Sequence, residues 1–358
     1  MLSDVKSTFI SIIIITKNNA DTIEKCITSL INQDYQKSKY EIIFVDGRSN
    51  DGTDTIIGQY LSSVKEPTIK LFYEDVGKMG YARNIGIEKA VGEILCFIDG
   101  DAYPEAIWMT KISDIYEKQP NTDVVGGIDI LSTENKVANV INARGKAERA
   151  YGGKAVTKLR TVNLAIRKRI LVESGGFDPS LSHFDEAELI SRIYIKHRVS
   201  SIVFDPDIVV YHDKARSSPE LRIKKQFKKS IIGVPVLFRS HMFRVALANP
   251  LSPVGTSLQF VFASIIFYLS VFFSLLGILN YILIPLLIII YLIILSIYTL
   301  TFKTHNIRTT LNIFFILILD SLSRFGGSCI GLIQFFFTIL FKSLFLPLYK
   351  GMRLSHVQ

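Results

Sequence analysis

Two apolar runs in the first hundred residues each end in aspartate. The run at residues 42–45 leads into Asp46, and the run at residues 94–98 leads into Asp99 and, one glycine later, Asp101. Short apolar runs rich in β-branched residues are typical of strands buried on both faces of a parallel sheet. Ligands bind outside the carboxyl ends of such strands, so these aspartates are expected to mark a site.

The Asp-Gly-Asp turn at residues 99–101 has the chemistry of a divalent cation site. Hard cations prefer oxygen ligands, and one or two carboxylates hold them together with substrate phosphates. We therefore expect Mg²⁺ or Mn²⁺ as the cofactor, bound together with a nucleotide diphosphate.

Strand and helix patterns alternate around these runs, which predicts an α/β fold with a mostly parallel sheet. Strands are expected at residues 10–15, 41–45, 69–73 and 94–98, and helices at 21–32, 53–61 and 80–90. The later pattern is mixed, with extended runs at 124–127, 162–166, 202–204 and 208–211 and a helix at 185–196.

Hydrophobic residues are concentrated in the last third of the chain. Residues 245–302 contain no charged side chain. They include two runs, at about 257–277 and 281–302, that are long enough to cross a bilayer as helices. A further apolar region, at about 309–345, is broken by charged residues. A buried soluble hairpin is the alternative, but its helices would usually be shorter and amphipathic.

The chain is therefore expected to have a soluble domain at 1–248 and an α-helical transmembrane domain at 249–358. Positive residues follow the second run at 303–308 and recur near the C-terminus, which favours an even number of crossings.

Positive charge gathers just before the first predicted span. The formal net charge is +9, and residues 214–244 hold nine Lys and Arg against one acid, Glu220, a local charge of +8. The positive-inside rule places this segment in the cytoplasm, where anionic lipid headgroups attract it. A multi-pass cell-membrane protein with its soluble domain in the cytoplasm is expected. No nucleic-acid partner is expected, because no nucleic-acid-binding motif accompanies the charge.

Four short motifs follow one another in the first hundred residues: SIIIITKN at 11–18, EIIFVDGRSNDGT at 41–53, GYARNIG at 80–86 and GEILCFIDGD at 92–101. In this order and spacing the chain resembles the inverting family 2 glycosyltransferases, which have the GT-A fold. The resemblance covers about residues 9–233. It implies that a sugar is transferred from a UDP- or GDP-sugar donor.

The resemblance also implies roles on the nucleotide side. Thr16, Asn18 and Asp46 would hold the base, since a carboxylate accepts N–H bonds from uracil or guanine. Asp51 is interpreted instead as a cap for the following helix, where Asp is favoured in any case. Arg83 is expected to contact the donor diphosphate, with a surface salt bridge as the alternative.

Asp99 and Asp101 correspond to the DXD motif of the family. Asp99 would contact the sugar side of the donor and Asp101 the metal, with Asp99 and His212 as further candidate ligands. The cation would stabilise the charge that develops on the departing diphosphate.

An inverting transfer needs a base for the acceptor hydroxyl. The resemblance places it after the Gly-Gly-Phe-Asp turn at 175–178, where the family order is Glu-Asp followed by a further acid. Here the order is Asp185, Glu186, then Glu188. Glu186 takes the position of the base, and Asp185 is the alternative.

Gln226 and Lys229 fall where the family has its QxxRW-like, acceptor-holding segment, but the arginine and the aromatic residue are missing. Processive synthases rely on that segment, so its loss favours the transfer of a single sugar.

These features predict a membrane-anchored glycosyltransferase whose acceptor is a membrane lipid, such as polyprenyl phosphate or a lipid-linked glycan. A processive polysaccharide synthase is one alternative. A catalytically degenerate, nucleotide-binding membrane scaffold is another, and the reversed acidic pair is its main support. A transporter is disfavoured because the two clear spans contain no charged residue.

Overall fold

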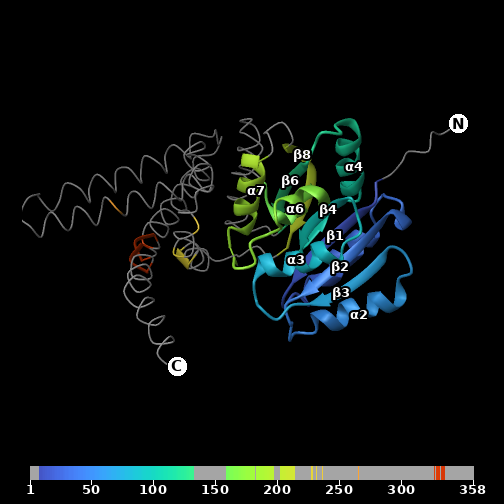
Figure 1. Ribbon diagram of the computed structural model, residues 1–358. Coiled ribbons are helices and arrows are strands. Elements are labelled where there is room, and N and C mark those ends of the chain that lie inside the picture. Colours follow the sequence, from blue (N-terminus) through green and yellow to red (C-terminus); the bar gives the residue numbers. More distant parts are fainter. Residues whose placement is uncertain are drawn as a thin grey trace, which may run out of the picture. The chain divides into compact units, whose positions relative to one another are not determined.

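The computed structural model describes residues 8–132, 159–181, 183–196 and 202–213, and further positions at 227, 228, 231, 236, 265, 326, 328–330 and 332–334. The chain divides into two compact units, Met1–Ser217 and Ser218–Gln358. Nearly all of the described residues lie in the first unit, which contains the sheet (Figure 1).

Eight strands form one sheet in the order β3-β2-β1-β4-β7-β6-β8-β5 (Figure 1). The first four are parallel, with Ile12 level with Ile42 and Cys96. Beyond β4 the sheet is mixed: β7 is antiparallel to β4 and β6, β8 is parallel to β6, and β5 is antiparallel to β8. The strands are β1 (Ile10–Thr16), β2 (Tyr40–Asp46), β3 (Thr68–Tyr73), β4 (Ile94–Asp99), β5 (Ala102–Pro104), β6 (Val124–Leu131), β7 (Leu164–Arg167) and β8 (Ile202–His212).

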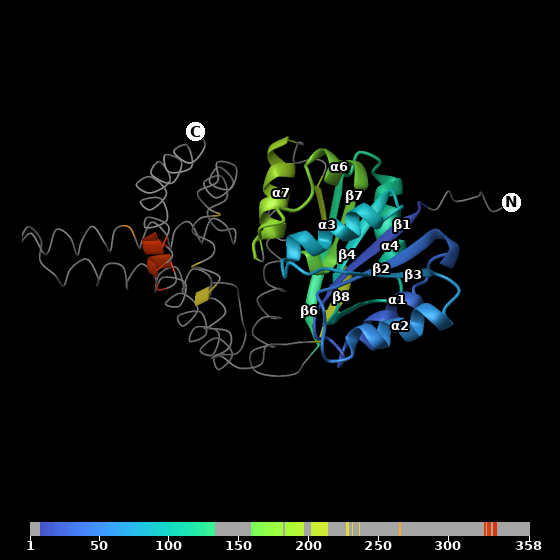
Figure 2. The same ribbon diagram turned by 60° about the horizontal axis from the view of Figure 1, so that its bottom comes forward.

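Helices cover both faces of the sheet. Figure 2 shows α1 and α2 on one side and α3, α6 and α7 on the other. The helices are α1 (Ile23–Ile31), α2 (Thr53–Ser63), α3 (Met79–Lys89), α4 (Trp108–Lys118), α6 (Lys168–Glu173) and α7 (Asp185–Lys196), with 3₁₀ turns at Lys37–Lys39 and Thr161–Asn163.

Strand β1 explains why two hydrophobic cores form. Its side chains alternate between the faces, so Ile12 and Ile14 pack with α1 and α4 while Ile13 packs with α3 and α7. A strand that is apolar on both faces can be buried only between two helical layers. The continuous isoleucine run thus specifies a central strand.

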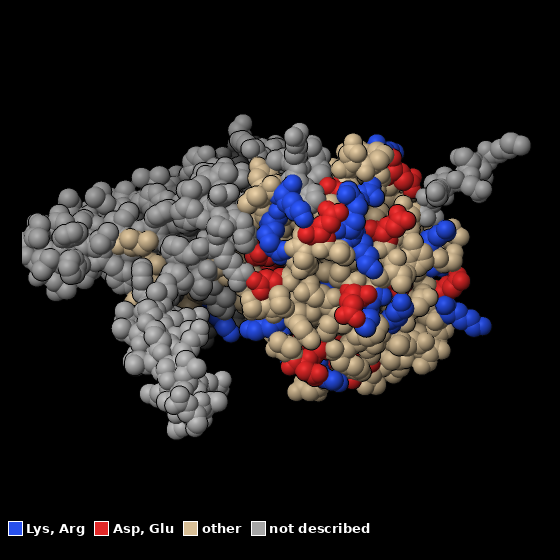
Figure 3. Space-filling view, viewed as in Figure 1, with Lys and Arg blue, Asp and Glu red and all other residues tan. Residues whose placement is uncertain are grey.

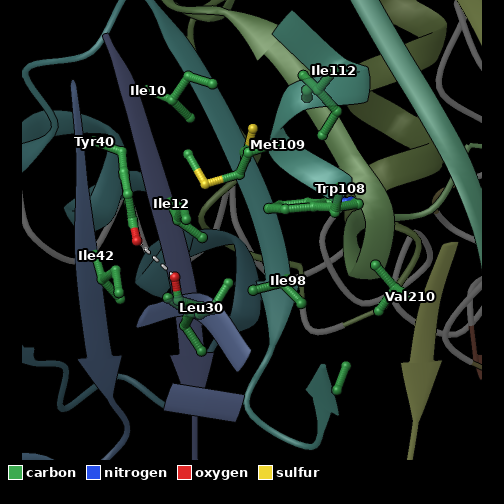
Figure 4. Close-up of a cluster of buried hydrophobic side chains, with 14 of the residues drawn as sticks. Ile10, Ile12, Leu30, Tyr40, Ile42, Ile98, Trp108, Met109, Ile112 and Val210 are labelled. Carbon is green, nitrogen blue, oxygen red and sulfur yellow. Dashed lines mark hydrogen bonds between the residues drawn. The ribbon is translucent and has the colours of Figure 1, made fainter. Parts of the chain in front are cut away.

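The core on the α1 and α4 side also satisfies its buried polar groups (Figure 4). The Tyr40 hydroxyl donates to the Leu30 carbonyl at 2.9 Å. Trp108 is fully buried, and its Nε1 donates to Asn163 Oδ1 at 2.9 Å. A buried N–H or O–H without a partner would cost roughly 1–3 kcal/mol, so these bonds hold the aromatic anchors in place.

The strands and helices expected in the first hundred residues are confirmed, with boundaries shifted by two residues or fewer. The expected parallel pairing is confirmed for β3, β2, β1 and β4, and β6 and β8 are parallel as well. Strand β7 inserts antiparallel between β4 and β6. Strand β5 and helices α4 and α6 were not expected. The two extended runs at 202–204 and 208–211 form one continuous strand, β8.

The predicted spans at 257–277 and 281–302 and the broken region at 309–345 lie almost entirely outside the described residues. Among the helices that are described, none combines the length and the apolar character needed to cross a bilayer. The division between the two units falls within the basic segment 214–244. On the face of the first unit seen in Figure 3, basic and acidic side chains lie next to one another.

Candidate active site

The sheet brings two aspartates and a histidine together at one edge. β4 ends at Asp99, and Asp101 lies in the turn that leads into β5. Because β5 pairs antiparallel with β8, Ala102 lies opposite His212. The His212 Nε2 atom is 3.0 Å from Asp101 Oδ1. One ligand atom each from Asp99, Asp101 and His212 lie within 4.8 Å of one another.

The electrostatics of this group suit a cation. Within the described residues, Asp99 Oδ1 is buried and accepts no hydrogen bond. Burial raises the pKa of Asp99, although the charges of Arg83 and His212 oppose the increase. Burial by itself would lower the pKa of His212, but the hydrogen bond to Asp101 and the charges of both aspartates raise it overall. Two carboxylates and an imidazole are a ligand set that fits a divalent cation. The buried Asp99 oxygen without a hydrogen bond would gain a partner if the cation were bound.

The acidic residues at the start of α7 differ in their surroundings. Asp185 is 1% exposed, and Glu188 is buried in a two-point ion pair with Arg192, with both N···O distances at 2.7 Å. Glu186 is the one of the three that is partly exposed. Burial raises the pKa of Asp185 to about 6, with Arg83 opposing the increase and Glu186 adding to it. The geometry therefore leaves Glu186 as the acid that can reach a substrate.

Arg83 lies between the two acidic groups. Its side chain is 2% exposed and forms an ion pair with Asp185. Its Nη2 donates to Thr161 Oγ1 at 2.9 Å and lies 3.6 Å from Asp99 Oδ1. This placement differs from the expected contact with the donor diphosphate, because the guanidinium is buried and already paired. The alternative, a surface salt bridge, does not describe Arg83 either, because its ion pair is buried.

The residues predicted for the nucleotide side form one loop cluster. Asp46 is fully buried at the end of β2, and its two oxygens accept bonds from the Ser49 N–H at 2.7 Å and the Ser49 hydroxyl at 2.6 Å. Asn18 has a positive φ of 54°, donates its N–H to Ser49 Oγ at 2.9 Å, and accepts from the Asn50 N–H at 3.0 Å. Thr16 is also buried, at 5% exposure, and its hydroxyl donates to Asn19 Oδ1 at 3.1 Å. Asp46 and Asn18 thus brace the same turn at residues 47–50.

Asp51 precedes Gly52, the N-cap of helix α2, and its carboxylate bonds the first residue of the helix, so it has the structural role that the sequence indicates. Its Oδ1 accepts both the N–H of Thr53, at 3.1 Å, and the Thr53 hydroxyl, at 2.5 Å. Its Oδ2 accepts the N–H of Ala20 at 3.0 Å, which ties the loop after β1 to this helix.

Arg160, which the sequence does not single out, lies close to the same acidic groups. It pairs with Asp129 on β6 at 2.7 Å, and its side chain is 56% exposed. The charge of Asp129 raises the pKa of Arg160, and Glu186 and Asp99 are close enough to add to the increase. No local motif marks this arginine, because its partners come from three distant segments. Gln226 and Lys229 lie outside the described residues.

The chain is similar to known glycosyltransferases. A family model described as Glycosyl transferase family 2 matches residues 11–171. The glycosyltransferase AglE of Haloferax volcanii is 32% identical over 244 residues, which cover 66% of this chain and 77% of AglE.

A second relative, from Methanococcus voltae, is named dolichyl N-acetyl-alpha-D-glucosaminyl phosphate 3-beta-D-2,3-diacetamido-2,3-dideoxy-beta-D-glucuronosyltransferase. It is 35% identical over 136 residues, 37% of this chain and 42% of that protein. Among solved structures, the mannosyltransferase PcManGT from Pyrobaculum calidifontis, in complex with GDP-Man and Mn²⁺, aligns with a TM-score of 0.54 at 18% identity. The alignment covers 89% of this chain and 88% of that one, which indicates a common fold.

Proposed function

Because the chain belongs to glycosyl transferase family 2, we propose that it transfers one sugar, with inversion, from a UDP- or GDP-sugar to a lipid-linked acceptor. The observation that carries this proposal is the meeting of a cation-binding group and an acidic pair around one buried arginine. Arg83 is 3.6 Å from Asp99 on one side and ion-paired with Asp185 on the other. Glu186, next to Asp185, is partly exposed at the same place.

Asp99, Asp101 and His212 would hold Mg²⁺ or Mn²⁺. When bound, the ion supplies positive charge for the diphosphate oxygens of the donor. The two carboxylates are partly buried, and the β4–β5 turn and the β5–β8 pairing fix the backbone that carries them. That rigidity suits a site where charge must be stabilised as it develops.

In the proposed reaction, an acceptor hydroxyl oxygen attacks the anomeric carbon of the donor sugar. The bond from that carbon to the diphosphate oxygen breaks, and the electron pair leaves with the diphosphate. Glu186 takes the proton of the hydroxyl. Attack from the face opposite the leaving group inverts the anomeric configuration, which is why the base must lie across from the diphosphate.

Arg160 takes the role first expected of Arg83. An arginine can contact phosphate oxygens with two parallel N–H bonds, but only if its guanidinium is accessible. Arg160 is more than half exposed, whereas Arg83 is 2% exposed. We therefore assign the phosphate contact to Arg160. The turn held by Asp46 and Asn18 would receive the nucleotide base, together with Thr16.

The lipid acceptor and the membrane anchor are supported by three features. The name of the Methanococcus relative includes a dolichyl N-acetyl-alpha-D-glucosaminyl phosphate, which is a lipid-linked sugar. Residues 245–302 carry no charge, and residues 214–244 carry a local charge of +8. A cytoplasmic first unit next to the bilayer would meet a polyprenyl phosphate or lipid-linked glycan at its headgroup.

The test is product analysis with the full-length protein in native-lipid vesicles. The vesicles receive a panel of UDP- and GDP-sugars, and extracted lipids are examined by mass spectrometry. We expect a lipid that gains the mass of one sugar with one donor, and no product from the Asp101→Ala variant. Addition of many sugars to one lipid would support a processive synthase. Donor binding without any product would support a nucleotide-binding scaffold.

A further inference from the structure

One face of helix α3 holds the segment that leads into α7. Gly80, Arg83 and Asn84 are spaced three and four residues apart, so they lie on the same side of the helix. Each of them contacts residues between 176 and 185. Helices α3 and α7 lie on the same side of the sheet in both ribbon views (Figures 1 and 2).

Asn84 pairs with the backbone of the glycine turn. Its Nδ2 donates to the Phe177 carbonyl at 2.8 Å, and its Oδ1 accepts the Phe177 N–H at 2.9 Å. The preceding residue, Gly176, has a φ of +69°, and a Cβ there would lie 2.7 Å from Asn84 Oδ1. Only glycine therefore allows the turn to approach the amide this closely.

Gly80 allows the next part of the segment to approach the helix. Its N–H donates to the Leu181 carbonyl at 3.3 Å. A Cβ at Gly80 would collide with the Asp178 carbonyl oxygen. The backbone at 178–181 thus lies directly against the first turn of α3.

Arg83 fixes the end of the segment. Its ion pair with Asp185 and its bond to Thr161 are both buried. The guanidinium also lies 5.4 Å from the centre of the Phe177 ring, and that ring packs edge-on against Phe97. Removing one partner from a buried ion pair is costly, so this contact has little freedom to shift.

We propose that Arg83 and Asn84 are positioning residues that set the place of Glu186 relative to Asp99. Asn84 holds the start of the segment and Arg83 holds Asp185, the residue next to Glu186. Arg83 also lies beside Asp99, so one helix locates both the base and the cation site. A shift of about 1 Å in a reacting group can cost on the order of 10²-fold in rate. This inference rests on the proposed role of Glu186 as the base.

The test is a double-mutant cycle with Asn84→Ala and Glu186→Gln. In the wild-type background, Asn84→Ala should lower kcat at least about tenfold and leave the donor KM within about twofold. In the Glu186→Gln background the same change should alter kcat by less than about twofold, because the group it positions no longer accepts a proton.

Gln33→Ala is the matched control. Gln33 is also a buried amide that bonds backbone groups, Ser29 and Glu105 carbonyls and the Met109 N–H, but in the other core. Gln33→Ala should lower the stability of the protein, and its effect on kcat should be the same in the wild-type and Glu186→Gln backgrounds. If Asn84→Ala does not fold, Asn84→Asp replaces it, since it keeps an acceptor for the Phe177 N–H. If Glu186→Gln is impaired and the effects of the two substitutions on kcat simply multiply, the positioning role is overturned and the base assignment is not. A fully active Glu186→Gln enzyme overturns the base assignment and the positioning role together.

Discussion

His212 lies 3.0 Å from Asp101 although 111 residues separate them in the sequence. The contact exists because β8 runs parallel to β6 and its last residues pair with β5. It joins an imidazole to the Asp-Gly-Asp turn and completes the proposed ligand set, which neither segment has alone.

Asp101→Ala should remove cation binding while the fold is retained, because Asp101 lies in a partly exposed turn. We expect Mn²⁺ affinity, measured by calorimetry on the purified protein, to fall at least about tenfold and turnover to be lost. Asp114→Ala, on the exposed face of α4, is the control. Wild-type turnover that persists in EDTA would contradict the metal-dependent reaction.

Glu186→Gln should lower kcat by about 10²–10⁴-fold, because the amide cannot accept a proton. Donor affinity should stay nearly unchanged. Asp185→Asn should act on stability more than on rate, since Asp185 is buried against Arg83. Single-turnover rates and donor binding separate the two effects. An inactive Asp185→Asn enzyme beside an active Glu186→Gln enzyme would move the base by one residue.

Arg160→Ala should weaken binding of the donor diphosphate. The matched variant is Arg169→Ala, because Arg169 also forms a single ion pair with an aspartate and is similarly exposed, 58% against 56%. We expect an increase in donor Kd of about tenfold or more for Arg160→Ala, the size of one charge-assisted contact, and little change for Arg169→Ala. Equal donor affinity in both variants would exclude the phosphate contact.

Stability should depend on pH through Asp185. Its pKa in the folded protein is about 6, above the ordinary 3.8, so folding favours its protonated form. The stability gained in this way is fully present below about pH 4 and is lost as the pH rises through 6. Relative to Asp185→Asn, the wild type should therefore lose up to about 3 kcal/mol between pH 4 and 7. Urea unfolding of both proteins at several pH values tests this. A difference that is constant with pH, or that grows in the opposite direction, would contradict it.

A cysteine placed at Asn280 should react with an impermeant maleimide in intact cells, since the residue lies between the two predicted spans. A cysteine at Ser62, on the exposed surface of α2, should be protected. The Cys329→Ser background removes the one native cysteine that is not buried. The reverse labelling pattern would place the first unit outside the cell.

The parallel half of the sheet could be predicted because its strands are marked locally. The apolar runs that end at Asp46 and Asp99 correspond to β2 and β4 within two residues. Helix α4 had a similar signal, since Trp108, Met109 and Ile112 recur at helical spacing and are buried. Six-residue α6 is too short to show such a repeat.

The surroundings of individual side chains could not be predicted. Arg83 and Asp185 are 102 residues apart, and nothing near either residue indicates that they pair. A motif shows which residue types occur together, but burial depends on which strands are neighbours. The antiparallel insertion of β7 next to β4 decides this in the second half of the sheet, and the pairing of strands is not encoded in a local pattern.

The pairing of β5 with β8 also affects how the protein is made. Synthesis proceeds from the N-terminus, so both aspartates of the cation site leave the ribosome long before His212 does. A nascent chain that already contains all four parallel strands still lacks β8, the strand that pairs with β5 beside the Asp101 turn. Ribosome-bound chains stalled at successive lengths should therefore gain cation binding only after residue 212 has emerged. Sugar transfer would then begin only when the first unit is complete.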